Sequence, residues 1–284
     1  FGYDWLDNKV TGIFKGELVV IGGETGTGKT VFATNVLYKA SKKHKCGVFA
    51  LEDRLHDYGI KALYFEIGRL RKEKNGPDTK NYPWNDYRKN IIHDNQYIEL
   101  RKEALENLKN DNLFFADVPM QMDIELFEKL VEEKVSEGYQ LFLVDHLHYF
   151  DLLKDKDTTK ADYIEKVMIR MRTLQRKTGA RILLVVHYKK LSGSRPGLDS
   201  FKDSISIAQN ANYVINIWRD RTEKKERDFK TTFSISKSRN PNGEATIEVE
   251  FDPMINDYKP LWPDWKYGTS EVVIEQKEID LKYL

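Results

Sequence analysis

Residues 18–30 read LVVIGGETGTGKT, an apolar run followed by a glycine-rich segment that ends in Lys29 and Thr30. The segment matches G-x-x-x-x-G-K-[ST] in the context the pattern requires, after a strand and before a helix. Glycines let backbone N–H groups turn inward around phosphates, and the dipole of the following helix adds positive charge. A glycine turn with an incidental lysine is the alternative interpretation. The sequence predicts a site for ATP or another nucleoside triphosphate, made of Gly23, Glu24, Thr25, Gly26, Thr27, Gly28, Lys29 and Thr30.

Two loop residues and two acidic positions outside the loop supply the rest of the expected chemistry. Lys29 is expected to bridge β- and γ-phosphate oxygens, and Thr30 is expected to hold Mg²⁺. Asp145 ends an apolar strand, which is costly unless the carboxylate faces a cation or solvent, so we expect it to hold Mg²⁺ through water. Glu52 ends another predicted strand and is the expected base for the attacking water, with Asp53 as the alternative. Because neighbouring residues at a strand end face opposite ways, only one of the two reaches the γ-phosphate.

Apolar runs alternate with helical periodicity along the rest of the chain, which is typical of an α/β fold with a mainly parallel central sheet flanked by helices. The continuous runs at 141–144 (LFLV) and 182–186 (ILLVV) predict central strands covered on both faces. Asn-Pro-Asn-Gly at 240–243 predicts a tight turn, so an antiparallel hairpin closes the fold. The predicted strands are 17–22, 47–51, 113–116, 141–144, 182–187, 213–218, 233–237 and 246–251.

Helical segments separate these strands. Residues 124–135, behind Asp123 as N-cap, and residues 162–177 each carry an apolar stripe, which we interpret as core. Residues 54–112 predict a helical insert, interrupted at 75–85 by two prolines and two turn signals. One basic cluster in the insert is expected on a solvated face, with a binding patch as the alternative, and its members are Arg69, Arg71, Lys72 and Lys74.

Composition narrows the class of protein. The 284 residues hold 46 basic and 45 acidic side chains, so any affinity for nucleic acid must come from a local basic patch. One cysteine forbids an internal disulfide and fits a reducing compartment, so a cytoplasmic protein is expected. With no long apolar run, no membrane partner is expected. Because the chain begins with Phe1, we expect it to be a piece of a longer protein.

The order of these motifs resembles the RecA-type ATPase core, and within that group the C-terminal motor domain of DnaB-type replicative ring helicases. The resemblance runs from about Asp4 to Tyr258. It is carried by the segments 11–30 (TGIFKGELVVIGGETGTGKT), 48–52 (VFALE), 141–150 (LFLVDHLHYF), 202–220 (KDSISIAQNANYVINIWRD) and 236–243 (SKSRNPNG). It implies one motor domain over 1–260. The tail 261–284 has no counterpart, and the loop 202–209 lacks the glycine and second acidic residue common in the family.

Two histidines favour the branch of phage helicase-primases and mitochondrial Twinkle. His146 follows Asp145, and the strand 182–186 is followed by His187. The resemblance implies that His187 senses the γ-phosphate and relays hydrolysis to the DNA loop, and an imidazole suits this because its hydrogen-bonding capacity changes with its charge. A structural histidine at a strand end is the alternative. A zinc cluster of His146, His148 and His187 is disfavoured because the magnesium role already explains the strand.

The family resemblance also assigns residues near the C-terminal hairpin. Lys237 and Arg239 resemble the Lys-x-Arg pair that reaches the neighbouring subunit's nucleotide in ring ATPases, where a cation stabilises charge on the transferring phosphoryl group. Solvated hairpin cations are the alternative. The resemblance further implies that Arg219 and Phe251 sandwich the base, and a Phe251 buried in the core is the alternative.

Single-stranded DNA is the expected polymer partner. The segment 187–202 holds four basic residues against one acidic residue and few aromatic rings, which favours tracking of backbone phosphates over base stacking. The segment 154–160 (KDKDTTK) predicts either a second pore loop or a solvated linker. The residues expected to bind DNA are Lys189, Lys190, Arg195 and Lys202.

These observations give one leading hypothesis and two alternatives. The leading hypothesis is an ATP-dependent replicative DNA helicase motor that translocates on single-stranded DNA as a homo-oligomeric ring, expected to be a hexamer. The alternatives are a RecA- or KaiC-like ATPase that does not unwind duplexes, and a nucleotide-gated scaffold for a primase or helicase loader.

Overall fold

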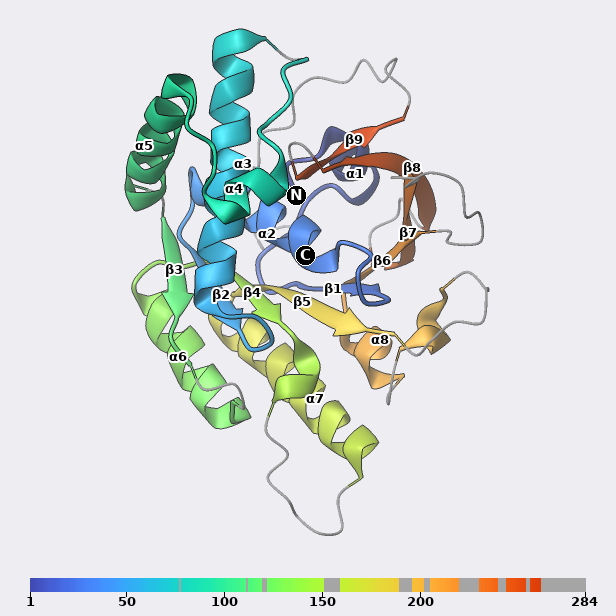
Figure 1. Cartoon of the computed structure of the whole chain (residues 1–284). Coiled ribbons are helices and arrows are strands. Elements are labelled where there is room, and N and C mark those ends of the chain that lie inside the picture. Colours follow the sequence, from blue (N-terminus) through green and yellow to red (C-terminus); the bar gives the residue numbers. More distant parts are fainter. Residues whose placement is uncertain are drawn as a thin grey trace, which may run out of the picture.

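The chain folds around a single large sheet, which Figure 1 shows between two groups of helices. The computed structural model describes residues 1–76, 78–110, 112–118, 122–150, 159–188, 196–201, 205–219, 230–239, 244–253 and 256–261. Within these ranges the sheet has nine strands in the order β3-β2-β4-β5-β1-β6-β7-β8-β9. Strands β3 to β6 in this order run parallel, and β6 to β9 pair antiparallel. The strands are β1 (Leu18–Gly23), β2 (Cys46–Ala50), β3 (Leu113–Ala116), β4 (Leu141–Asp145), β5 (Arg181–His187), β6 (Tyr213–Trp218), β7 (Lys230–Ser238), β8 (Ala245–Asp252) and β9 (Asp257–Pro260).

The sequence-based prediction of a mainly parallel sheet with a terminal antiparallel hairpin is confirmed. Strands β4 and β5 lie at the centre as expected, since a strand covered on both faces needs apolar side chains on both. The turn 240–243 lies outside the described residues. Strand β9 was not predicted, because its four residues include three polar or proline positions and show no apolar alternation.

Helices cover both faces of the sheet. Helices α6, α7 and α8 pack on one face, while α1 and α2 pack on the other (Figure 1). Side chains of β4 alternate between the two faces. Phe142 and Val144 belong to the core with α6, α7 and α8, and Leu141 and Leu143 belong to the core with α1 and α2. The helices are α1 (Asp4–Val10), α2 (Lys29–Ser41), α3 (Leu55–Asn75), α4 (Trp84–Lys89), α5 (Asn95–Asn110), α6 (Ile124–Ser136), α7 (Lys160–Thr178) and α8 (Ser206–Asn210).

Local signals explain where two of these helices begin and end. Asp123 is the N-cap of α6, as predicted, and its side chain accepts a hydrogen bond from the Glu125 N–H at 3.0 Å. Helix α7 begins with a capping box between Thr159 and Asp162 and ends at Gly179, whose φ of 74° lies in the left-handed region. Each interaction satisfies backbone groups that a helix terminus leaves unpaired.

The predicted helical insert is present between β2 and β3 as α3, α4 and α5. These helices form a small core rich in aromatic rings, in which Tyr64 and Tyr87 are buried. The basic cluster expected on a solvated face is partly paired, because Arg69 binds the buried Glu66 at 2.7 Å. The insert is therefore a packed lobe with its own core and its own buried ion pair.

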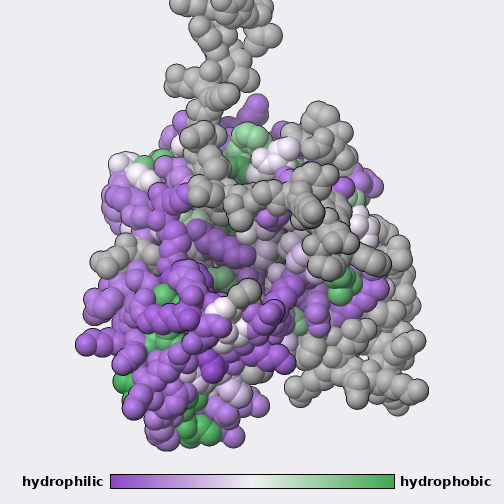
Figure 2. Space-filling model, turned by 90° about the horizontal axis from the view of Figure 1, so that it is seen from above, coloured by the Kyte–Doolittle hydropathy of each residue, from purple (hydrophilic) through white to green (hydrophobic). Residues whose placement is uncertain are grey.

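The described residues on the face shown in Figure 2 are mostly hydrophilic. On this face the hydrophobic residues form small patches that hydrophilic residues separate from one another. No helix in the described part of the chain is long and apolar enough to cross a bilayer.

Candidate active site

The predicted phosphate-binding residues and acidic residues meet at one edge of the sheet. Gly23 pairs with His187 where β1 and β5 end, and Ala50 pairs with Asp145 where β2 and β4 end. Glu52 follows β2 by two residues. Ligands of parallel α/β sheets bind outside the carboxyl ends of the strands, so this edge is the candidate active site.

The segment Gly23–Thr30 forms a tight loop between β1 and α2. Gly26 and Gly28 have φ angles of 79° and 97°, and residues with side chains rarely adopt these values. The Thr27 hydroxyl donates to the Glu24 carbonyl at 2.9 Å, and Nζ of Lys29 donates to the same carbonyl at 2.8 Å. A Cβ at Gly23 would lie 2.6 Å from the Ile217 carbonyl oxygen. The glycines thus allow the positive φ angles of the loop and its close approach to the Ile217 backbone.

Lys29 is buried at the start of α2, with 4% of its surface exposed. Burial lowers the pKa of its ammonium group to about 8, and the negative charges of Asp145, Glu52 and Glu24 oppose that change. A desolvated cation at a helix N-terminus is suited to an anionic ligand.

Asp145 supports the expected magnesium position. It is 1% exposed, and burial raises the pKa of its carboxyl group while hydrogen bonds from Tyr58 and Thr30 lower it. Its Oδ2 accepts from the Thr30 hydroxyl at 2.7 Å and from the Tyr58 hydroxyl at 2.6 Å. Its Oδ1 is buried without a hydrogen-bond partner among the described residues. A hydroxyl oxygen beside an unsatisfied carboxylate oxygen is a donor set that fits Mg²⁺.

The structure separates the two candidate bases. Both carboxylate oxygens of Glu52 lie 3.3–3.4 Å from Nε2 of His187. Asp53 instead forms a 2.7 Å ion pair with Lys61 on α3. Both carboxylates act electrostatically on Asp145, but of the two only Glu52 is among the groups that act on Lys29. Of the two, Glu52 is therefore the carboxylate that joins the candidate active site.

His146 is a functional candidate that the sequence analysis did not assign to catalysis. Its ring lies 4.2 Å from the ring of His187. Its Nδ1 accepts from the His148 N–H at 3.2 Å, which leaves the proton of the neutral ring on Nε2. Burial, the first of several causes, lowers its pKa to about 2, so the ring is neutral. The buried Nε2 has no partner in the described part of the chain, so it can donate to an incoming oxygen.

The grouping of metal-ligating side chains differs from the disfavoured three-histidine zinc cluster. Among the described residues, the ligand atoms of Glu52, His146 and His187 lie within 4.8 Å of one another. Glu52 takes the place of His148 in this grouping, and its carboxylate oxygens lie 3.3–3.4 Å from Nε2 of His187.

Aromatic and cationic side chains border the loop on its other side. The Arg219 guanidinium lies 4.9 Å from the centre of the Phe251 ring, and that ring lies 5.2 Å from Tyr258. The Tyr258 hydroxyl donates to the Gly28 carbonyl at 3.1 Å, and a Cβ at Gly28 would clash with this hydroxyl. The structure thus brings Arg219 and Phe251 together beside the loop, with the guanidinium over the Phe251 ring. Tyr258, which the sequence analysis did not single out, anchors them.

The two cations expected to act on a neighbouring subunit differ in their surroundings. Lys237 lies in β7, and its Nζ donates to the carbonyls of Ala208 and Gln209 at 2.7 and 2.9 Å. Arg239 follows the end of β7, and it is exposed. Of this pair, Arg239 alone presents a surface cation, since Lys237 holds the C-terminal end of α8 in its own chain.

The predicted DNA-binding residues Lys189, Lys190, Arg195 and Lys202 lie outside the described residues, as do positions 154–158 of the second predicted loop. The described ends of the predicted DNA-binding segment 187–202 are held together. Tyr188 and Phe201 form an antiparallel bridge, and their ring centres are 5.3 Å apart. That bridge directly follows His187.

Fold and site define a nucleotide-binding domain of RecA type. The profile of the DnaB-like helicase C terminal domain matches residues 1–260, and the chain belongs to this family. The chain is 22% identical to the replicative DNA helicase DnaB of Mycoplasma genitalium, over 93% of the chain and 57% of the relative. It is 26% identical to the replicative DNA helicase DnaB of Helicobacter pylori, over 77% of the chain and 43% of the relative. It is 21% identical to the replicative DNA helicase DnaC of Bacillus subtilis, over 92% of the chain and 56% of the relative.

Two solved structures share the fold. A solved ATPase domain superposes with a TM-score of 0.76 and 17% identity, covering 92% of this chain and 90% of the other. A DnaB-like replicative helicase, described together with its interactions with primase, also superposes with a TM-score of 0.76. The sequence identity is 16%, and the superposition covers 92% of this chain and 61% of the other. The chain spans about half the length of the sequence relatives named above.

Proposed function

We propose that the chain is the ATP-hydrolysing motor of a replicative DNA helicase and moves along single-stranded DNA as a homo-oligomeric ring. The observation that carries this proposal is the pairing of Glu52 with His187 at 3.3 Å, beside Lys29 and Asp145. This arrangement joins a base, a phosphate-facing side chain and the start of the predicted DNA loop. Membership of the DnaB-like family supports it.

Nucleotide binding uses the loop and its lysine. Backbone N–H groups of 23–30 and the ammonium of Lys29 bind phosphate oxygens, and Arg219 with Phe251 borders the base. Thr30 and Asp145 hold Mg²⁺, which when bound neutralises charge on the phosphate oxygens. The fit rests on the unsatisfied Oδ1 of Asp145 beside the Thr30 hydroxyl.

Hydrolysis uses Glu52 as the base. Its carboxylate accepts a proton from the attacking water, and the Nε2–H of His146 donates to an oxygen at the γ-phosphate position. With nucleotide bound, His187 exchanges its contact with Glu52 for the γ-phosphate. Release of phosphate restores the contact, and the Tyr188–Phe201 bridge passes this change to the loop that carries Lys189, Lys190, Arg195 and Lys202.

Assembly completes the site. The exposed Arg239 reaches the γ-phosphate of the neighbouring subunit, and repetition around a hexameric ring lines a pore with the basic loops. A primase or helicase loader is the further partner, as the solved relative with primase interactions suggests.

The test measures hydrolysis and unwinding with the full chain. We expect single-stranded DNA to stimulate ATP hydrolysis and the chain to displace a strand from a forked duplex when ATP is present. Lys29→Ala should lose both, whereas Lys61→Ala, which removes a cation outside the site, should retain both. Hydrolysis without stimulation or strand displacement, in rings verified by native mass, would assign the chain to non-unwinding ATPases.

A further inference from the structure

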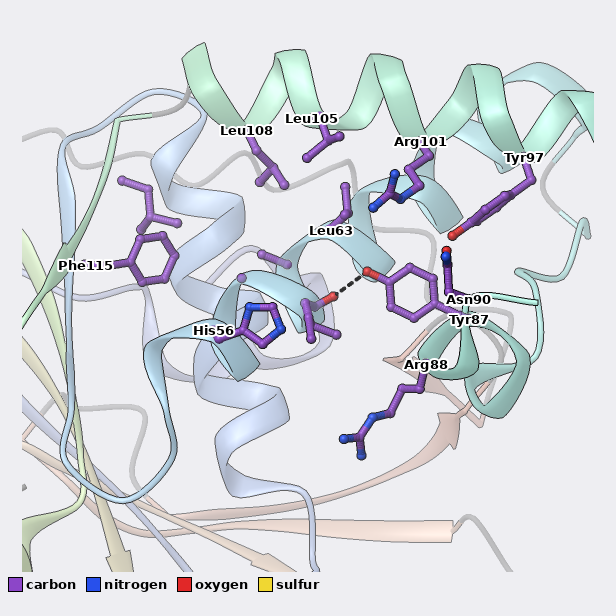
Figure 3. Close-up of a pocket in the computed structure, with 14 residues that line it drawn as sticks. His56, Leu63, Tyr87, Arg88, Asn90, Tyr97, Arg101, Leu105, Leu108 and Phe115 are labelled. Atoms are coloured by element: carbon purple, nitrogen blue, oxygen red, sulfur yellow. Dashed lines mark hydrogen bonds between the residues drawn. The ribbon is translucent and has the colours of Figure 1, made fainter. Parts of the chain in front are cut away.

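A cavity lies in the helical insert, away from the candidate active site. It has a volume of about 470 Å³ and lies between α3, α5 and the edge strand β3. Figure 3 shows Leu105 and Leu108 pointing from α5 toward Leu63 on α3, with Phe115 of β3 at one end. The volume is in the range of ligand-binding pockets, and the walls are mainly apolar. None of the reactions proposed above uses this cavity.

The charged side chains among its described lining residues are basic. Arg88 and Arg101 line the cavity together with His56, and no aspartate or glutamate is among the described residues that line it. Neither arginine forms an ion pair within the described residues, although Arg69 and Lys74 on the same lobe do. Figure 3 shows Arg101 extending from α5 into the space above Tyr87. An apolar cavity with two guanidinium groups outside any ion pair fits an occupant with apolar side chains and carboxylates.

The cavity continues onto an exposed apolar surface. Leu105 is 36% exposed, and Ile98, two turns earlier on α5, is 56% exposed. Beside them β3 ends the sheet, so one side of its backbone lacks a strand partner in the described structure. Large exposed apolar groups next to a free strand edge are characteristic of a surface that binds a polypeptide.

We propose that residues 271–284 of this same chain dock in this cavity. The segment reads EVVIEQKEIDLKYL, with four acidic and two basic residues and seven apolar or aromatic ones. Its net side-chain charge, two basic minus four acidic residues, is −2 and complements the two arginines of the cavity. Its Ile279, Leu281 and Tyr283 alternate with polar residues, a pattern that presents one apolar face when extended.

The position of β9 brings the segment within reach. The Tyr64 hydroxyl on α3 lies 3.3 Å from the Pro253 carbonyl before β9, and burial followed by the charge of Lys259 lowers the pKa of Lys72 on the same helix. Lys72 is nine residues beyond Leu63, or about 14 Å along the helix. The nine residues 262–270 can span about 30 Å when extended, which covers that distance.

Disulfide trapping tests the contact in the full chain. Leu105→Cys with Leu281→Cys should form a disulfide within one chain, seen as a mass loss of about 2 Da without change of monomer size; the native Cys46 is buried and does not compete. Leu105→Cys with Thr269→Cys is the matched control and should remain reduced. Equal trapping in both pairs, or trapping only between chains, would overturn the proposal.

Two further comparisons test the charge complementarity and the apolar contacts of the docked segment, and the second of them uses no engineered thiols. Arg101→Glu should reduce trapping, while Lys102→Glu, an equal charge change on the exposed neighbour, should not. In the otherwise unmodified chain, Ile279→Asp with Leu281→Asp should speed hydrogen exchange of α5, and Thr269→Asp with Ser270→Asp should leave it unchanged. Identical exchange of α5 in the two double variants would mean that the segment does not dock.

Discussion

The Tyr58 hydroxyl donates a 2.6 Å hydrogen bond to Oδ2 of Asp145, the oxygen that also accepts from Thr30. Tyr58 belongs to α3, so the first helix of the insert contacts the proposed magnesium ligand directly. Burial and the nearby Asp145 charge raise the pKa of Tyr58, which keeps the hydroxyl protonated as a donor. The insert is thus part of the support of the active site.

Replacing Tyr58 by phenylalanine tests this support. The variant keeps the ring and removes one hydrogen bond to a buried carboxylate, worth about 1.5–3 kcal/mol. We expect the Mg²⁺ concentration for half-maximal ATP hydrolysis to rise by about tenfold or more. In the wild type this hydrogen bond lowers the pKa of Asp145, so its removal should raise that pKa. The acid limb of the pH profile should therefore also move to higher pH.

Tyr64→Phe is the matched control for this prediction. Tyr64 is equally buried on α3, but its hydroxyl donates to the Tyr82 carbonyl at 2.7 Å, away from Asp145. It should reduce stability without changing the Mg²⁺ requirement. An unchanged Mg²⁺ requirement in Tyr58→Phe would show that the hydroxyl only stabilises the fold.

The two acidic residues after β2 should differ sharply in their effect on turnover. Glu52→Gln should retain nucleotide binding and lose about 10²-fold or more in the rate of hydrolysis, since general-base assistance is worth that much. Asp53→Asn removes an exposed ion pair with Lys61 and should change the rate less than about threefold. Steady-state ATPase rates and binding of a fluorescent nucleotide measure both. The reverse order of effects would make Asp53 the base.

The sequence predicted this sheet edge well because strand ends carry strong local signals. Glu52, Asp145 and His187 each follow an apolar run, and the parallel order of strands brings such ends together. The choice between Glu52 and Asp53 required the structure, because it depends on Lys61 on the next helix.

Contacts between distant segments carry no such signal. Tyr58 and Tyr258 approach the site from an inserted helix and from the last strand, and neither lies in a recognisable motif. The role of Lys237 was also hidden, because its partners are carbonyls of α8, a five-residue helix that the sequence analysis did not predict. Periodicity over five residues is too short to identify a helix.

Lys29 should reduce the stability of the nucleotide-free protein. Its pKa is lowered from 10.5 to about 8, so the unfolded chain binds the proton more tightly than the folded chain. The resulting loss of unfolding free energy is on the order of 3 kcal/mol. It applies in full below pH 8 and declines as the pH rises toward 10.5. Lys29→Met should therefore raise the free energy of unfolding at pH 7, and by less at pH 10.

Urea unfolding at both pH values measures this difference. Lys39→Met is a useful comparison, because burial also lowers the pKa of Lys39 but this lysine lies away from the phosphate loop, near Asp257. Added ATP and Mg²⁺ should stabilise the wild type and Lys39→Met but not Lys29→Met. Destabilisation by Lys29→Met at both pH values would contradict the prediction.

Lys237 and Arg239 should separate stability from catalysis. Lys237→Ala removes two hydrogen bonds to the C-terminal carbonyls of α8 and should cost about 1–2 kcal/mol of unfolding free energy. Arg239→Ala changes an exposed side chain and should stay within about 0.5 kcal/mol of the wild type. Thermal unfolding of the two variants measures this. A large loss of stability in Arg239→Ala would contradict its assignment as a surface cation.

Mixed rings test whether Arg239 acts on the neighbouring subunit. An Arg239→Ala subunit keeps a sound phosphate loop and lacks the cation, whereas a Lys29→Ala subunit has the reverse defect. Each alone should be nearly inactive in ATP hydrolysis. Mixed at equal concentration with single-stranded DNA, they form interfaces that pair a sound loop with a sound Arg239, so hydrolysis should exceed the sum of the separate rates.

The readout for these mixed rings is steady-state hydrolysis, because we expect unwinding to need several working interfaces in sequence. A mixture of Glu52→Gln with Lys29→Ala is the matched control. Both changes damage the site on the side that holds the nucleotide, so no interface in that mixture regains a sound loop together with a base. It should therefore stay at the sum of its parts. If the Arg239→Ala mixture also stays at the sum, with mixed rings verified by native mass, Arg239 does not act across the interface.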